Sequence, residues 1–272
     1  MLSYRDFTKV FKDLDLGSSS QVIVHANVDA LGDIAGGANT IVGALLATCG
    51  SIITPTFTNR TMVIPPYGPE NNALVYGEIP DQGEFGKMFR SNMTSDPELG
   101  EVAEIIRKHP QAIRSNHPLL SFAGIGAEEA LATQSLEDPW GPIKWLADAD
   151  GGVLLLGADQ RMNVSIHAAE FLAGRKLFLR WAMSGGKVVE VPHWPGCAEG
   201  FQSIGQHLHG VARTKELGRS FAEIIPLRDL INIVTGWIRE DEEALLCERP
   251  ECEYCIAMRA VENASKRSNS AA

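Results

Sequence analysis

Hydrophobic and polar positions alternate along the chain in short blocks that predict helices and buried strands in turn. Residues 3–15 repeat apolar side chains at helical spacing, and Ser3 stands where a helix cap is expected. Four further elements follow in order: an apolar run at 21–25, a glycine-containing loop at 32–37, a helical pattern at 39–48 and a second apolar run at 51–54. This order is typical of a βαβ unit, which favours a parallel sheet covered by helices on both faces.

The rest of the chain continues this pattern after one interruption. Residues 60–95 are rich in Pro, Gly and Asn and lack a clean period, so they predict a surface loop or, as the less simple interpretation, a segment that contacts substrate. The other predicted elements are helices at 98–109, 127–133, 164–172, 198–209 and 227–239, strands at 119–126 and 152–157, and a hairpin joining 180–183 to 187–191. The pattern predicts an α/β fold with a mainly parallel central sheet flanked by helices and an additional smaller mixed α/β portion. We expect one domain over residues 1–260 and a flexible C-terminal tail over 261–272.

Composition narrows the class of protein. A chain of 272 residues can bury a large core, and 44% hydrophobic with 21% charged residues excludes general disorder. The net charge of −10 comes without a basic stripe, so we expect no nucleic-acid partner, whereas a cationic ligand is compatible. The start of the chain is polar, and no apolar run approaches the roughly 20 residues of a membrane helix. Five unevenly spread cysteines do not resemble a secreted disulfide framework, so we expect a cytoplasmic protein whose oligomeric state stays open.

The sharpest chemical pattern is a histidine and a glutamate after the apolar strand 153–156. His167 and Glu170 stand three residues apart on a predicted helix, hence on one face of it. A carboxylate beside an imidazole fixes its tautomer and stabilises its protonated form, which suits a general base. Ser165 lacks the geometry of an activated serine nucleophile. From spacing alone, a capping serine with a surface His–Glu pair is at least as good an interpretation.

Two weaker signals lie earlier in the chain. His117 precedes a proline in residues 114–121, a setting that is more often an ordinary turn than a phosphate or carbonyl contact. Gly32, Gly36 and Gly37 only loosely resemble a phosphate-binding loop, and neither a P-loop nor a well-formed dinucleotide fingerprint is present.

Taken together and in order, several segments resemble the aminoglycoside N3-acetyltransferase family, also called the antibiotic N-acetyltransferase family. The segments are VHANVDALGDIAGGA at 24–38, TPTFT at 54–58, RSNHPLLSFA at 114–123, LLLG at 154–157, NVSIHAAE at 163–170 and GCAEGF at 196–201. The resemblance spans roughly residues 5–255, and the ordered combination is far more specific than any single piece.

The resemblance implies transfer of an acetyl group from acetyl-CoA to an amino group, N3 of the 2-deoxystreptamine ring of an aminoglycoside. It implies that His167 is the general base and Glu170 its orienting partner. It also implies a set of CoA-binding residues: His25, Asn27, Val28, Asp29, Ala35, Gly36, Gly37, Ser115 and His117. Three alternatives stay open: an acyltransferase for another amine in biosynthesis, a protein that binds CoA or aminoglycoside with little turnover, and a hydrolase that uses His167 with water.

The chain departs from the family pattern on the side expected to bind CoA. Ala26 and Asn27 stand where the family usually has two serines, and Asp29 stands where a basic residue is usual. The family's GxGSP loop is reduced to Trp140–Pro142, and residues 60–84 have no clear counterpart.

The cysteines form a separate pattern. Cys247, Cys252 and Cys255 are closely spaced, and with Cys197 they could close a tetrahedral structural zinc site. Reduced cysteines on a terminal helix are an equally good interpretation, and His193 is an alternative to Cys197 as the fourth ligand. Cys49 lies on an apolar helix and is expected in the core.

Overall fold

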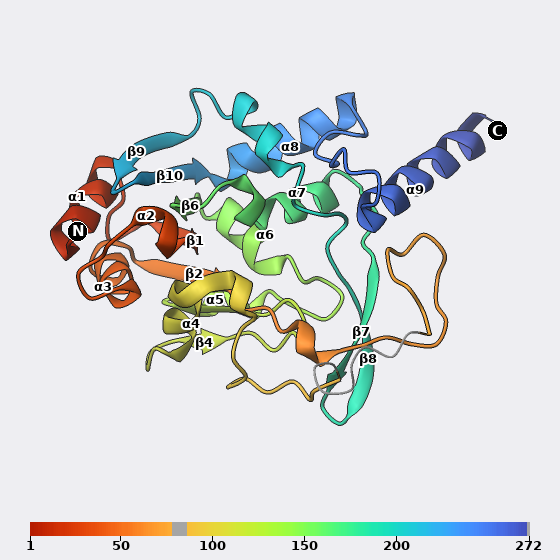
Figure 1. Ribbon diagram of the computed structural model, residues 1–272, viewed down its shortest axis with the longest axis horizontal. Coiled ribbons are helices and arrows are strands. Elements are labelled where there is room, and N and C mark those ends of the chain that lie inside the picture. The colour runs from red at the N-terminus through yellow and green to blue at the C-terminus, as the bar shows by residue number, and fades with distance from the viewer. Residues whose placement is uncertain (78–85, 271–272) are drawn as a thin grey trace.

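Strands from the whole length of the chain form one seven-stranded sheet in the computed structural model, which describes residues 1–77 and 86–270, with side chains as far as Val261. The strand order is β4-β5-β2-β1-β6-β10-β9 (Figure 1). The strands are β1 (Gln21–Ala26), β2 (Ser51–Pro55), β4 (Ile113–Arg114), β5 (Phe122–Ile125), β6 (Gly152–Leu156), β9 (Arg213–Leu217) and β10 (Ser220–Pro226).

The centre of this sheet is parallel and its margins are antiparallel. Ile23 of β1 pairs in parallel register with Ile53 of β2 and with Val153 of β6. The pairs β2–β5, β5–β4, β6–β10 and β10–β9 are antiparallel. The three central strands are almost entirely buried, as expected for parallel strands covered on both faces. The predicted α/β class is confirmed, with the parallel part confined to these three strands.

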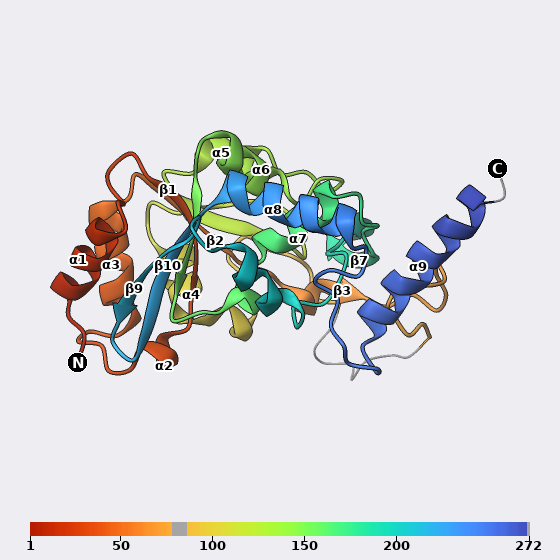
Figure 2. The same cartoon turned by 90° about the horizontal axis from the view of Figure 1, so that it is seen from above.

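Alternate residues of the central strands enter two different cores. Val22, Val24 and Leu154 pack with the helices α1, α3 and α4, while Ile23 and Val153 pack with α5, α6, α7 and α8. Figure 2 shows α1 and α3 on one side of the sheet and α5, α6 and α8 on the other. The helices are α1 (Tyr4–Asp13), α2 (Val28–Leu31), α3 (Ala38–Thr48), α4 (Gly100–Lys108), α5 (Glu128–Ala132), α6 (Gly141–Asp148), α7 (Ser165–Leu172), α8 (Leu227–Glu240) and α9 (Glu253–Ser270).

A smaller antiparallel sheet, β3-β7-β8, stands beside the main body. Its strands are β3 (Met62–Val63), β7 (Leu179–Ser184) and β8 (Lys187–Pro192), and the last two form the hairpin that the sequence predicts. Of the loop-like stretch 60–95, residues 78–85 lie outside the described part. The predicted helix at 198–209 is instead a 3-10 helix, η4 (Phe201–His207).

The C-terminal segment is helical. Helix α9 continues without interruption to Ser270 and projects away from the sheet (Figures 1 and 2). Residues 271 and 272 lie outside the described part, and both the domain boundary at 260 and the flexible tail at 261–272 stay predictions. Among the described residues, no helix is both long and apolar enough to span a bilayer.

Candidate active site

His167 and Glu170 lie together on α7, the helix that follows the central strand β6. The Nδ1 atom of His167 is 2.9 Å from Oε2 of Glu170, and both side chains are buried. A carboxylate oxygen accepts, so Nδ1 carries the proton and Nε2 keeps its lone pair. Helical spacing brings the two residues onto one face, but burial makes the pair a fixed unit instead of a surface salt bridge.

A third residue, Arg175, completes this unit from just beyond the helix. Its guanidinium donates to the second oxygen of Glu170, Oε1, at 2.5 Å. It also donates to the backbone carbonyls of Glu242 and Ala244, at 2.7 and 2.6 Å. Glu170 is completely buried, so an uncompensated carboxylate there would be costly, and Arg175 supplies the opposing charge. The arginine therefore offsets the charge of the buried carboxylate and holds it toward His167.

Aromatic rings enclose the imidazole of His167. Trp194 stacks on it with ring centroids 5.6 Å apart and planes 18° apart, and Phe201 meets it edge-on at 4.7 Å. Trp140 is a third neighbour at 6.2 Å, and its side chain is fully buried. The rings restrict the imidazole to one orientation and keep bulk water from its faces.

His167 faces a cavity of about 410 Å³ at the carboxyl end of the sheet. Its apolar walls come from Pro55, Phe57, Leu99 and Trp194, and Glu98 and Arg161 lie at its margin. Open α/β sheets commonly bind ligands at this end of their strands. The volume fits part of a substrate, such as a thioester and the amine it meets.

Two larger grooves adjoin the cavity. The first, of about 840 Å³, runs between α2 and α4, and the second, of about 700 Å³, runs along β10 and η3 (Gln160–Met162). Met162 borders all three spaces, and Asn27 borders both grooves. A cavity that adjoins two grooves can receive two different molecules at one point.

The first groove, here called the acidic groove, carries five carboxylates. They are Asp29, Asp96, Glu98, Glu101 and Glu104. Glu104 is paired with Arg107 and Lys108, at 2.7 and 3.0 Å. Burial raises the pKa of Asp96 to about 6, although the backbone N–H of Asn59 donates to it at 2.8 Å. Glu98 borders both this groove and the apolar cavity, so it places negative charge next to the reaction space.

The residues expected to bind CoA separate into two groups. His25 lines the cavity opposite His167, and burial lowers its pKa to about 3, so its ring is neutral at pH 7. Asn27, Val28 and Asp29 line the acidic groove, and the Asn27 side chain caps α2 by accepting from the N–H of Ala30 at 3.3 Å. These four predicted residues lie at or near the site.

The other predicted CoA-binding residues do not line the cavity or either groove. Ala35, Gly36 and Gly37 form the turn before α3, where the Ala35 N–H donates to the Leu2 carbonyl. Ser115 exchanges hydrogen bonds with the backbone of Phe122, at 2.8 and 3.2 Å. The observed hydrogen bonds of Ala35 and Ser115 stabilise the local backbone.

His117 is fixed in the same way. Its Nδ1 atom accepts from the backbone N–H groups of Leu119 and Leu120, at 3.2 and 2.9 Å. Burial lowers its pKa to about 4, so the ring is neutral at pH 7 and offers no positive charge to a phosphate.

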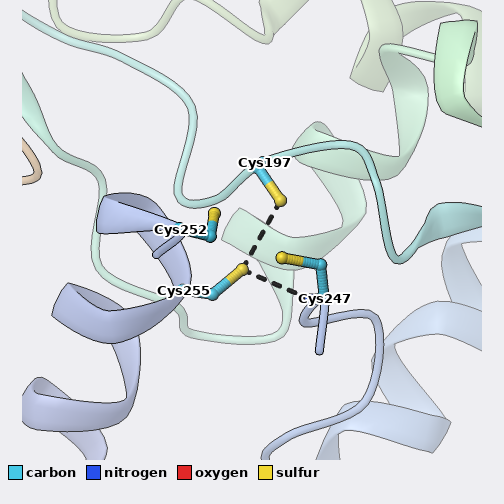
Figure 3. A group of neighbouring side chains, drawn as sticks. All are labelled: Cys197, Cys247, Cys252 and Cys255. Carbon is cyan, nitrogen blue, oxygen red and sulfur yellow. Dashed lines mark hydrogen bonds between the residues drawn. The ribbon is translucent and has the colours of Figure 1, made fainter. Parts of the chain in front are cut away.

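The predicted zinc ligands do come together. Cys197, Cys247, Cys252 and Cys255 place their sulfur atoms within 4.8 Å of one another (Figure 3). His193 is not in this group, and within the described residues neither of its ring nitrogens has a hydrogen-bond partner. Cys49 lies apart in the core beside α3, as expected.

Several site residues carry no signal in the sequence. Arg175 lies five residues beyond Glu170, and nothing in its neighbourhood indicates that it folds back onto the carboxylate. Trp194 belongs to a segment read only as a loop, and Glu98 was one acidic residue among many. Phe201 ends the family-like segment GCAEGF, but nothing in that segment indicates a contact with His167. Each becomes part of the site only through contacts between distant segments.

The α/β fold and a buried histidine–glutamate unit facing a cavity are those of an acyltransferase. Residues 23–239 match the aminoglycoside 3-N-acetyltransferase family, and the chain belongs to it. Aminoglycoside N(3)-acetyltransferase VII of Streptomyces paromomycinus is 28% identical over 86% of this chain and 91% of its own length.

Solved structures of similar fold agree. The apoenzyme of aminoglycoside acetyltransferase AAC(3)-IVa superposes with a TM-score of 0.78 at 21% identity, over 95% of this chain and 97% of that one. AAC-IIIb, in a binary complex with CoASH, superposes with a TM-score of 0.74 at 20% identity, over 88% and 96%. At these identities the likeness shows the fold alone.

Proposed function

We propose that this protein transfers the acetyl group of acetyl-CoA to N3 of the 2-deoxystreptamine ring of an aminoglycoside, with His167 as general base. The observation that carries the proposal is the buried His167–Glu170–Arg175 unit at a cavity that two grooves adjoin. Transfer between two substrates needs such a meeting point, and hydrolysis would need only one groove.

The proton balance follows from the tautomer of His167. With Nδ1–H donating to Glu170, Nε2 accepts the proton that the amine loses as its nitrogen attacks the thioester carbonyl. The new C–N bond gives a tetrahedral oxyanion, which collapses as the C–S bond breaks. The proton on Nε2 then passes to the departing CoA sulfur, which leaves His167 neutral again. Glu170 stabilises the imidazolium between these two transfers.

The acidic groove is the proposed binding surface for the acceptor. Aminoglycosides carry several ammonium groups, and the exposed carboxylates of Asp29, Glu98 and Glu101 offer complementary charge. Glu98 lies where the groove meets the cavity, so it can hold an ammonium group near the one that reacts. This arrangement favours a polycationic amine over a neutral acceptor.

The donor is proposed to reach the cavity past His25 and Asn27. His25 lines the cavity and Asn27 lines both adjoining grooves. The structure of the similarly folded AAC-IIIb is a binary complex with CoASH. The turn 35–37, Ser115 and His117 remain predicted CoA residues, but their observed hydrogen bonds suit a structural role equally well. A cytoplasmic location belongs to the same proposal, and the five free cysteines suit a reducing compartment.

The test is a thiol-release assay with purified protein, acetyl-CoA and a panel of aminoglycosides. Release that requires the aminoglycoside, with NMR placing the acetyl group on N3, would support the proposal. Release without any amine would instead identify a hydrolase, and CoA binding without release would identify a binding protein. Acetylation of a different amine alone would support the proposed acetyl transfer but would show that the proposed acceptor is wrong.

A further inference from the structure

The four-cysteine group joins two segments that are distant in the chain. Cys197 lies in the loop after β8, Cys247 lies between α8 and α9, and Cys252 and Cys255 lie at the start of α9 (Figure 3). Cys247, Cys252 and Cys255 are buried, and Cys197 is partly exposed. None of the proposed catalytic steps uses these thiols.

The sulfur positions match a tetrahedral metal site. A zinc ion with four Zn–S bonds of about 2.3 Å gives sulfur–sulfur edges of about 3.8 Å. In this structure all four sulfurs lie within 4.8 Å of one another, and Cys197 and Cys255 are 3.5 Å apart. The longest sulfur–sulfur distances would have to shorten by at most about one ångström for all four sulfurs to bind one zinc ion.

Hydrogen-bond donors and cations adjoin the sulfur atoms. The backbone N–H of Cys247 donates to the Cys255 sulfur at 3.3 Å. A zinc ion with four thiolates has a net charge of −2, and nearby arginines can offset it. Arg259 donates to the Cys247 carbonyl at 2.9 Å, and Arg249 stands two residues beyond Cys247 in the chain.

The cysteine group adjoins the catalytic cavity through Cys197. Cys197 lines the cavity, as does Tyr254 of α9, and Gly196 is so close to Glu170 that a β-carbon added there would stand 3.5 Å from Oε1. Whatever joins Cys197 to α9 therefore also positions the loop that packs against the catalytic carboxylate.

We propose that Cys197, Cys247, Cys252 and Cys255 bind one zinc ion in a closed, structural site that fastens the loop 193–199 to α9 and thereby fixes one wall of the catalytic cavity. Four protein ligands leave no position for substrate or water, so the ion stabilises the fold and takes no part in the chemistry. The inference does not depend on which amine the enzyme acetylates.

Metal content is the first test. Protein purified without chelator should hold one zinc ion per chain by elemental analysis, and Cys255→Ser should lose it. Cys49→Ser, which changes a buried cysteine outside the group, should retain full zinc. Less than one-tenth of an equivalent of zinc in protein grown with added zinc, together with four thiols or a disulfide by mass spectrometry, would overturn the proposal.

Cobalt substitution keeps the test informative if Cys255→Ser does not fold. Wild-type protein stripped of metal and loaded with Co²⁺ should show the intense visible bands and thiolate charge-transfer absorption of a tetrahedral four-sulfur site. Weak octahedral bands would contradict the proposed ligand set. Removing the metal should also make Trp194 fluorescence more accessible to acrylamide quenching, and unchanged quenching would refute the fastening of the cavity wall.

Discussion

The catalytic cavity and the acidic groove lie side by side but are built on opposite principles. In the cavity, His167, Glu170 and Arg175 are buried and joined by direct hydrogen bonds. In the groove, Asp29 and Glu98 are exposed. In the cavity, pairing of opposite charges offsets the free-energy cost of removing them from water. In the groove, the carboxylates stay exposed and can bind a cationic ligand.

From this difference we infer that the cavity determines the rate of acetyl transfer and the acidic groove determines the affinity for the acceptor. A buried, fully partnered unit is rigid and can position a proton acceptor, but any change also disturbs the fold. Exposed carboxylates contribute little to the fold and can attract a cation from solution. We therefore expect substitutions in the cavity to lower kcat and stability, and substitutions in the groove to change KM.

The largest effect is expected from His167→Gln. Loss of the general base should lower kcat/KM by about 10²–10⁴-fold, because glutamine at this position cannot take the proton from the amine. Steady-state thiol release measures this, and circular dichroism checks that the fold is retained. The matched control, His209→Gln, removes an exposed histidine and should leave the rate unchanged. A wild-type kcat in His167→Gln would show that His167 is not the general base and that this cavity is not the active site.

Arg175→Met tests the claim that the cavity is also a stability element. It removes the arginine that pairs with the buried carboxylate of Glu170 and donates to the carbonyls of Glu242 and Ala244. We expect a loss of about 3–5 kcal/mol in the free energy of unfolding, measured by urea denaturation.

The control for Arg175→Met is Arg228→Met. Arg228 forms an ion pair with Asp150 whose side chains are 54% and 81% exposed. Its removal should cost less than about 1 kcal/mol. Equal losses in the two variants would erase the contrast between buried and exposed pairs.

Glu98→Gln addresses the acidic groove. Removing one exposed carboxylate should raise KM for an aminoglycoside about two- to fivefold, with kcat nearly constant, because an exposed charge pair contributes about 0.2–1 kcal/mol. The effect should shrink at high salt. Glu128→Gln, at the exposed start of α5, is the matched change of charge elsewhere. A larger effect on kcat than on KM would contradict this prediction and would show that Glu98 contributes to the chemical step.

The last prediction concerns stability and Asp96, which burial separates from the exposed carboxylates of the groove. Burial raises its pKa to about 6, so the folded state binds a proton more tightly than the unfolded state does. Wild-type stability should therefore fall relative to Asp96→Asn as the pH rises from about 4 to about 6. Denaturation curves across this range give the difference. A difference that grows in the opposite direction would show that the carboxylate is stabilised by its neighbours.

Much of the fold could be predicted from the sequence because local patterns determine it. The apolar runs at 21–25, 51–54 and 152–157 became the parallel strands, and the Gly185–Gly186 turn joined its hairpin. The prediction of an α-helix at 198–209 was wrong in helix type, because the apolar spacing there suits a 3-10 helix as well as an α-helix.

The site could be predicted only in part, for a physical reason. His167 and Glu170 are three residues apart, so helical geometry alone brings them together. Arg175 binds carbonyls nearly seventy residues further on, at Glu242 and Ala244, and no local pattern specifies that contact. The two grooves likewise arise from loops whose relative positions are set by packing of the whole domain.

The contact between Arg175 and residues 242–244 has a consequence for how the protein is made. The segment that supplies the two carbonyls follows the strands of the described sheet in the chain, so it is synthesised after them. A nascent chain can therefore assemble this sheet before the arginine beside Glu170 has all of its partners. We expect chains halted before residue 242 to fold these strands yet stay inactive, because the segment that anchors Arg175 is missing.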